Sequence, residues 1–88
     1  MTYTSFDTDT FSRKMKKLYK KDRLRFERVS KKIDEILQEP HHYKPLGNVM
    51  AGILHVHIDP FVLTFEIDEA GKLVRFLDFD HHDEVFGN

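Results

Sequence analysis

The 88-residue chain contains no cysteine and no long apolar run. Without cysteine it can form neither a disulfide framework nor a thiolate metal cluster, so any metal site would use histidine and carboxylate ligands. Nowhere do about 18 apolar residues follow one another, as a membrane span requires. The first residues also lack an apolar run of signal-peptide length. The sequence therefore predicts a soluble, cytoplasmic protein. Its length predicts a single domain over residues 1–88, because so short a chain cannot build two separate cores.

Basic side chains are scarce in one half of the chain and concentrated in the other. Residues 1–40 contain eleven lysines and arginines against seven acidic residues, a net charge of +4. Residues 41–88 contain three against eight, a net charge of −5, together with all six histidines. A basic face of this size can bind the phosphate backbone of a nucleic acid or an acidic partner protein, or it can simply solvate a helix surface.

No repeat, low-complexity stretch or Gly/Ser linker divides the sequence, so its elements belong to one domain. Residues 2–6 have the alternation of a short strand, which would be exposed at the edge of a sheet. Apolar residues at helical spacing then predict two helices. The first begins at Thr8 or one of the next two residues, a break near Asp22 separates the two, and Pro40 ends the second. Together they predict a helical hairpin.

After Pro40 the apolar residues follow a different period. Three short aliphatic and aromatic runs, residues 52–59, 61–67 and 73–79, predict consecutive antiparallel strands. The second run is apolar at almost every position, which indicates a central strand covered on both faces. A four-residue connection that ends at Gly71 predicts a hairpin loop in which this glycine takes a positive φ. The predicted fold is α+β in the order β-α-α-β-β-β, a helical hairpin packed on a small antiparallel sheet with a short C-terminal tail.

The segment from residue 44 to residue 87 contains motifs that go beyond this element order. They are Pro45-Leu46, a glycine before the first long strand (Gly52), an H-x-x-P motif (His57 to Pro60) that leads into an apolar strand, and His82 followed four residues later by Phe86-Gly87. In these motifs the chain resembles the RelE/ParE superfamily of type II toxin–antitoxin toxins, in particular its YafQ-like branch of mRNA interferases. The predicted element order is also that of the superfamily.

The resemblance implies a toxin that cleaves mRNA on the ribosome, without a cofactor, by attack of a 2′-hydroxyl on its own 3′-phosphate. Such a reaction needs a base, an acid and positive charge on the phosphate. The resemblance assigns the acid–base pair to His57 and His82, since imidazole can give or take a proton near neutrality. Acidic neighbours favour the charged imidazolium, so we expect His82 to be the acid and His57 the base. Lys44 is the expected cation.

Four further residues are predicted to bind the substrate. Phe86 matches the family's C-terminal aromatic residue and can stack on a base, which contributes about 1–3 kcal/mol, although it can equally close the core. His55 lies two residues before His57, so both side chains share one face of a strand. His81 precedes His82, and Asp59 lies within the H-x-x-P motif. The implied partners are a cognate antitoxin, the ribosome and mRNA, and no membrane.

Two departures from the family pattern keep other functions open. The acid that usually follows the proline of H-x-x-P is replaced by Phe61, and no lysine or arginine lies between Gly47 and Lys72. A ParE-type module that acts only by binding a protein, such as DNA gyrase or an antitoxin, fits this arginine-poor half. A third hypothesis is a transition-metal site, because histidine and aspartate are adequate zinc or nickel ligands. Its candidate ligands are His55, His57, His81, His82 and the nearby aspartates.

Overall fold

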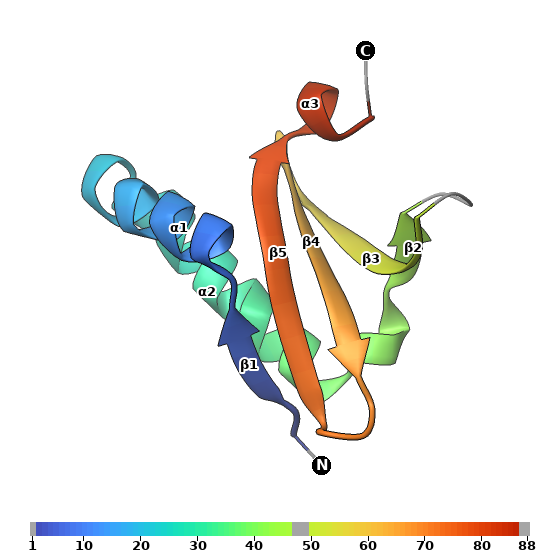
Figure 1. The fold of residues 1–88 in the computed structure, drawn as a ribbon. Coiled ribbons are helices and arrows are strands. Elements are labelled where there is room, and N and C mark those ends of the chain that lie inside the picture. Colours follow the sequence, from blue (N-terminus) through green and yellow to red (C-terminus); the bar gives the residue numbers. More distant parts are fainter. Residues whose placement is uncertain (1, 47–49, 87–88) are drawn as a thin grey trace.

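The computed structural model describes residues 2–46 and 50–86 (Figure 1). Two long helices lie on one side of a five-stranded sheet, and a short helix follows the last strand. This arrangement confirms the predicted α+β class. No helix in the described ranges has both the length and the apolar composition to span a membrane. The elements are β1 (Thr4–Asp7), α1 (Asp9–Lys21), α2 (Arg23–Gln38), the 3-10 turn η1 (Pro40–His42), β2 (Lys44–Leu46), β3 (Met50–Ile58), β4 (Phe61–Asp68), β5 (Leu73–His81) and α3 (His82–Phe86).

Side-chain caps fix the helical hairpin where the sequence predicts it. Thr8 begins α1, because its Oγ1 accepts a hydrogen bond from the Phe11 N–H at 3.3 Å. The same hydroxyl donates to the Phe76 carbonyl of β5 at 2.9 Å, so the cap also joins the helix to the sheet. Asp22 separates the helices and caps α2 by accepting from the Arg25 N–H at 3.1 Å. These caps satisfy backbone groups that a helix end leaves unpaired.

The sheet has the strand order β1-β5-β4-β3-β2. Strands β3, β4 and β5 form the predicted antiparallel meander, and β4 is central as its apolar sequence predicts. Strand β1 makes the sheet mixed, because it pairs with β5 in parallel. A parallel pair needs a long crossover connection, and the α1–α2 hairpin and the strands after it supply one. Strand β2, which the sequence did not predict, pairs with β3 at the other edge.

The β4–β5 connection differs from the prediction in one detail. The residue with a positive φ is Lys72 (φ 51) and not Gly71. The Asp68 carboxylate accepts a hydrogen bond from the Gly71 N–H at 3.3 Å, which closes the first part of the turn. The Lys72 N–H then donates to the Glu69 carbonyl at 3.2 Å. Side-chain closure by Asp68 therefore moves the left-handed position one residue along the chain.

The main core lies between the helical hairpin and one face of the sheet. Phe11 of α1 stacks on Phe76 of β5 with ring centroids 5.6 Å apart, and neither ring is exposed. Burial of each large apolar side chain contributes about 1.5–3 kcal/mol. Because α1 and α2 both lie on this face, they leave the opposite face of the sheet uncovered. The core residues are Phe11, Met15, Val29, Ile36, Leu63, Phe65, Val74, Phe76 and Phe79.

Candidate functional site

The sheet face opposite α1 and α2, here called the open face, carries most of the polar residues of the meander. Directly paired residues of neighbouring strands share a face, and successive residues alternate between faces. Since Leu63 lies in the helix-side core, its neighbours along β4 belong to the open face. Two rows of paired residues lie there: His55, Thr64 and Asp78 form one, and His57, Val62 and Asp80 form the next.

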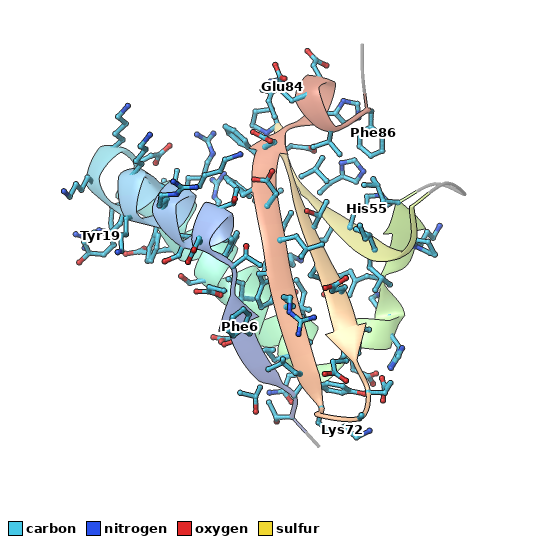
Figure 2. The ribbon with its side chains drawn as sticks, viewed as in Figure 1. Phe6, Tyr19, His55, Lys72, Glu84 and Phe86 are labelled. Atoms are coloured by element: carbon cyan, nitrogen blue, oxygen red, sulfur yellow. The ribbon has the colours of Figure 1, made fainter. Side chains whose placement is uncertain are left out.

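Helix α3 covers one end of the open face. The His82 N–H donates to the Pro60 carbonyl at 2.9 Å, which ties the first residue of α3 to the β3–β4 turn. The helix packs against β4 and β5, and Phe86 at its end lies beside His55 of β3 (Figure 2). Val62 beneath is fully buried although it lies outside the helix-side core. The predicted tail is therefore a helix that packs on the sheet.

Three histidines and one phenylalanine form a continuous aromatic group, here called the histidine cluster: His55, His57, His82 and Phe86. The ring centroids of His57 and His82 are 5.6 Å apart, and Phe86 lies 4.7 Å from His82. The Phe86 ring is nearly parallel to that of His57, with centroids 5.9 Å apart and planes 13° apart. The His55 ring stands edge-on to His57 at 5.3 Å. Two imidazoles at this separation can contact one phosphate group.

Lys44 lies next to this cluster. It pairs with His55 across β2 and β3, so its side chain leaves on the open face. The His55 Nδ1 is 3.1 Å from the Lys44 carbonyl oxygen. Because a carbonyl can only accept a hydrogen bond, Nδ1 carries the proton and Nε2 faces away from this contact. The register between the strands shifts after Pro45, near Gly52, whose φ of 93 suits glycine.

The other two predicted substrate-binding residues lie away from the cluster. His81 pairs with Phe61, and its ring stands edge-on to the Phe61 ring with centroids 5.8 Å apart. Phe61 packs against the helix-side core, so His81 belongs to the face opposite the histidine cluster. Asp59 is exposed in the β3–β4 turn. Gly87, the last residue of the C-terminal motif, and Gly47 lie outside the described residues.

Some of the acidic residues around the cluster form ion pairs with a lysine. Asp83 lies beside both adjacent histidines, with its carboxylate 3.7 Å from the His82 Nδ1. Asp78 and Asp80, however, form ion pairs with Lys14 of α1 at 2.6 and 3.0 Å. Lys14 was not predicted from the sequence, because no local pattern links a helix lysine to a strand near the other end of the chain. Thr64, a buried polar residue of the open face, was not predicted either.

The structure does not support the metal-site hypothesis in the residues that it describes. Within the ranges 2–46 and 50–86, no group of three or more histidine, aspartate or glutamate side chains is placed to hold a metal ion. In the histidine cluster the rings pack against one another and against Phe86.

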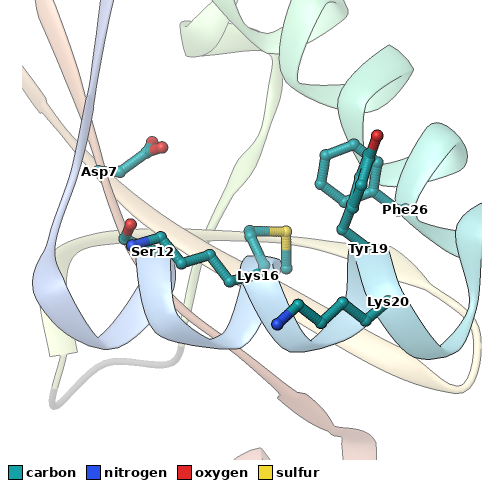
Figure 3. Close-up of a pocket in the computed structure, with 7 residues that line it drawn as sticks. Asp7, Ser12, Lys16, Tyr19, Lys20 and Phe26 are labelled. Atoms are coloured by element: carbon teal, nitrogen blue, oxygen red, sulfur yellow. The ribbon is translucent and has the colours of Figure 1, made fainter.

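A cavity of about 360 Å³ lies on a different part of the molecule, along α1 (Figure 3). Its apolar lining comes from Met15, Tyr19 and Phe26, and lysine side chains stand at its side. Burial raises the pKa of the Asp7 carboxyl, which lies at the end of β1. The lining residues are Asp7, Ser12, Met15, Lys16, Tyr19, Lys20 and Phe26.

Comparisons with known proteins support the resemblance seen in the sequence. A family model described as the ParE toxin of the type II toxin–antitoxin system, parDE, matches residues 8–86. The RelE4 toxin homologue of Methanocaldococcus jannaschii is 47% identical over 73 residues, which are 82% of this chain and 78% of that protein.

Solved structures share the fold. The toxin–antitoxin complex RelBE2 from Mycobacterium tuberculosis contains a chain that matches with a TM-score of 0.78 and 27% identity, covering 93% of this chain and 100% of that one. A mutant of the E. coli toxin RelE in the free state matches with a TM-score of 0.73 and 18% identity, covering 98% of this chain and 92% of that one. With the family model spanning nearly the whole described chain, this protein belongs to the RelE/ParE family of type II toxin–antitoxin toxins.

Proposed function

We propose that this toxin is a ribosome-dependent mRNA endoribonuclease of the cytoplasm that cleaves by metal-independent transesterification. The observation that carries the proposal is the contact between the His57 and His82 rings, 5.6 Å apart on the open face. Two imidazoles at one phosphate supply both a base and an acid near neutral pH. Family membership supports a toxin role, but the proposed reaction has to be argued from these side chains.

In the proposed reaction, His57 takes the proton of the 2′-hydroxyl as its oxygen attacks the adjacent phosphorus. His82 gives a proton to the departing 5′-oxygen as the phosphorus–oxygen bond breaks. The products are a 2′,3′-cyclic phosphate and a 5′-hydroxyl end. Lys44 steadies the charge that develops on the phosphate oxygens, because a cation placed there stabilises the transition state.

Phe86 and His55 are proposed to hold the nucleotide beside the reacting phosphate. Phe86 is 40% exposed while one side of its ring packs on the cluster, so the remaining surface is open to a base. Such stacking is tolerant of sequence. His81 and Asp59 have no role in this scheme, since one faces the opposite side of the sheet and the other lies in the exposed turn.

The exposed basic side chains of α1 are proposed to dock on ribosomal RNA. They provide a stripe of positive charge that can neutralise several phosphates, which makes association strongly salt-dependent. Strands β3 and β4 contain no lysine or arginine, so α1 is the better candidate for long-range attraction. The stripe consists of Arg13, Lys16, Lys17, Lys20 and Lys21.

A cognate antitoxin is the proposed protein partner. The similar RelBE2 chain comes from a toxin–antitoxin complex. In this chain, the cavity along α1 has an apolar floor beside Lys16 and Lys20, which suits an amphipathic segment with acidic residues at its edges.

Purified toxin incubated with translating ribosomes tests the nuclease proposal. We expect the parent chain to cut transcripts and both His57→Ala and His82→Ala to lose the activity. If both variants cut as well as the parent, the acid–base assignment is wrong. Mass analysis of the fragments should find 2′,3′-cyclic phosphate ends, and cleavage should continue when EDTA removes transition metals while an excess of magnesium keeps the ribosomes intact.

A second candidate function is inhibition by protein binding alone, as in the ParE type. The carboxylates of β5 on the open face favour it, because they oppose RNA binding. A supercoiling assay with purified DNA gyrase separates the two. Inhibition of gyrase by the parent and by His57→Ala alike, with no transcript cut, would replace the nuclease proposal.

A further inference from the structure

The ion pairs of Lys14 join α1 to the open face. The Lys14 Nζ donates to the Asp78 carboxylate at 2.6 Å and to the Asp80 carboxylate at 3.0 Å. Burial lowers the pKa of the Lys14 ammonium, but the hydrogen bonds that the ammonium donates to the two carboxylates outweigh this effect and raise the pKa above its usual value. Lys14 is therefore held as a cation between two anions, with its side chain about one-third exposed (35%).

The position of this group follows from the sheet. Strand β1 pairs with β5 only as far as Phe76, and α1 packs along β5 beyond it. Lys14 thus reaches the open face past the edge of the sheet. Asp80 is in the same row as His57, on the far side of Val62, at a separation of two strand spacings or about 10 Å. Asp78 is in the row of His55.

The open face therefore has a histidine side on β3 and a carboxylate side on β5. An RNA phosphate at the histidine cluster would still feel both carboxylates, because a separation of about 10 Å is close to the Debye length of about 8 Å at physiological ionic strength. Screening is therefore partial there, and it is weaker at lower ionic strength. Left unpaired, Asp78 and Asp80 would repel it. Lys14 cancels one of these charges directly and contacts both.

We propose that Lys14 is a positioning residue of the candidate site, which holds Asp78 and Asp80 in ion pairs so that an RNA phosphate can approach the histidine cluster. This inference rests on the proposed nuclease function, since it takes RNA as the ligand. Lys14 acts through the two aspartates and has no contact with the histidines among the described residues.

Two hydrogen bonds from neighbouring residues also hold Asp78 in place. Its carboxylate accepts a hydrogen bond from the Phe79 N–H at 2.8 Å, and the Thr64 hydroxyl donates to its backbone carbonyl at 3.4 Å. The carboxylate consequently stays on this side of the sheet when Lys14 is removed. Loss of the lysine thus exposes a negative charge at a defined place.

Binding of a 2′-O-methyl RNA hexamer of random sequence tests the inference without any cleavage, because the attacking hydroxyl is blocked. The intact toxin and its Lys14→Met variant are compared by fluorescence anisotropy at low and physiological ionic strength. We expect Lys14→Met to weaken binding roughly tenfold at low salt and about threefold at physiological salt, as screening dictates.

Two further variants show whether the aspartates transmit the effect. The triple variant Lys14→Met, Asp78→Asn, Asp80→Asn should regain the parent affinity, and Lys14→Arg should retain it. Lys31→Met on the exposed side of α2 is the matched control, because it removes the same charge away from the open face. Circular dichroism and thermal melting identify any variant that does not fold. If Lys14→Met is one of these, Lys14→Gln, which also removes the charge, takes its place with the same expected loss of affinity.

The outcomes separate this inference from the nuclease proposal. Unchanged affinity in Lys14→Met, a loss equal to that of Lys31→Met, or a loss that the two asparagines do not restore each overturns the role of Lys14. A parent chain that binds the hexamer in the expected pattern but cuts no transcript removes the nuclease proposal and leaves the role of Lys14 in place. A parent that cuts transcripts without binding the hexamer overturns the inference alone.

Discussion

The rings of His57 and His82 lie 5.6 Å apart, although one residue is near the end of β3 and the other begins α3. The β3–β4 turn explains this proximity, because the Pro60 carbonyl accepts the His82 N–H at 2.9 Å. The turn that follows His57 therefore also anchors the helix that carries His82. Phe86, one turn further along α3, then stacks on the His57 ring.

Replacement of either histidine should remove activity with little loss of stability. A general acid or base typically contributes 10²–10⁴-fold to a rate, so we expect His57→Ala and His82→Ala each to slow transcript cleavage by about that factor. The loss of rate in the double variant should be smaller than the product of the two single losses, since the two histidines act as a unit. Single-turnover assays on stalled ribosomes measure this, and His42→Ala in the exposed η1 turn is the control.

Replacement of Phe86 should weaken substrate binding more than chemistry. Phe86→Leu removes the aromatic face and should cost about 1–3 kcal/mol of RNA affinity, whereas Phe86→Tyr should keep it. The measurement is the concentration of ribosomes that gives half-maximal cleavage. If the half-maximal concentration is the same for the leucine and tyrosine variants, Phe86 only packs over Val62 and does not stack on a base.

The helix cap at Thr8 should contribute more to the free energy of unfolding than an isolated helix cap does. Its hydroxyl accepts from the Phe11 N–H and donates to the Phe76 carbonyl, so Thr8→Ala loses both contacts. We expect a loss of about 1–2 kcal/mol in the free energy of unfolding. Urea denaturation measures it. Thr10→Ala, two residues later on the exposed side of α1, should change stability by under about 0.5 kcal/mol.

Glu69 should give the fold a specific acid sensitivity. Hydrogen bonds from His41, Tyr3 and Lys72 hold the pKa of Glu69 below its usual value. A lowered pKa in the folded state means that the stabilisation is fully present above the unfolded pKa of about 4.3. It is lost as the pH falls through the folded value.

In Glu69→Gln this contribution is absent at every pH. The free energy of unfolding of the parent should therefore fall more steeply than that of the variant as the pH drops through the unfolded pKa of about 4.3 and then towards the lower folded value. Denaturation curves across this range provide the comparison, with Glu27→Gln on α2 as the control. Parallel curves would show that the contacts of Glu69 do not persist in solution.

Local signals determined a large part of this fold. The helix boundaries at Thr8, Asp22 and Pro40 follow from capping and from the missing N–H of proline, which act within a few residues. The central position of β4 follows from its apolar sequence. Family membership was visible in the motifs around His57 and His82, because such motifs are contiguous in sequence.

Tertiary structure alone decided the features that depend on distant partners. The parallel pairing of β1 with β5, the ion pairs of Lys14 with Asp78 and Asp80, and the placement of His81 on the face opposite His82 each join or separate residues by register and helix packing. Such contacts carry no short-range pattern, since their energy comes from groups that are neighbours only after folding. The sequence by itself thus determined the helical hairpin, the meander and the family, and the packing of α1 and α3 on the sheet decided which side chains face a common ligand.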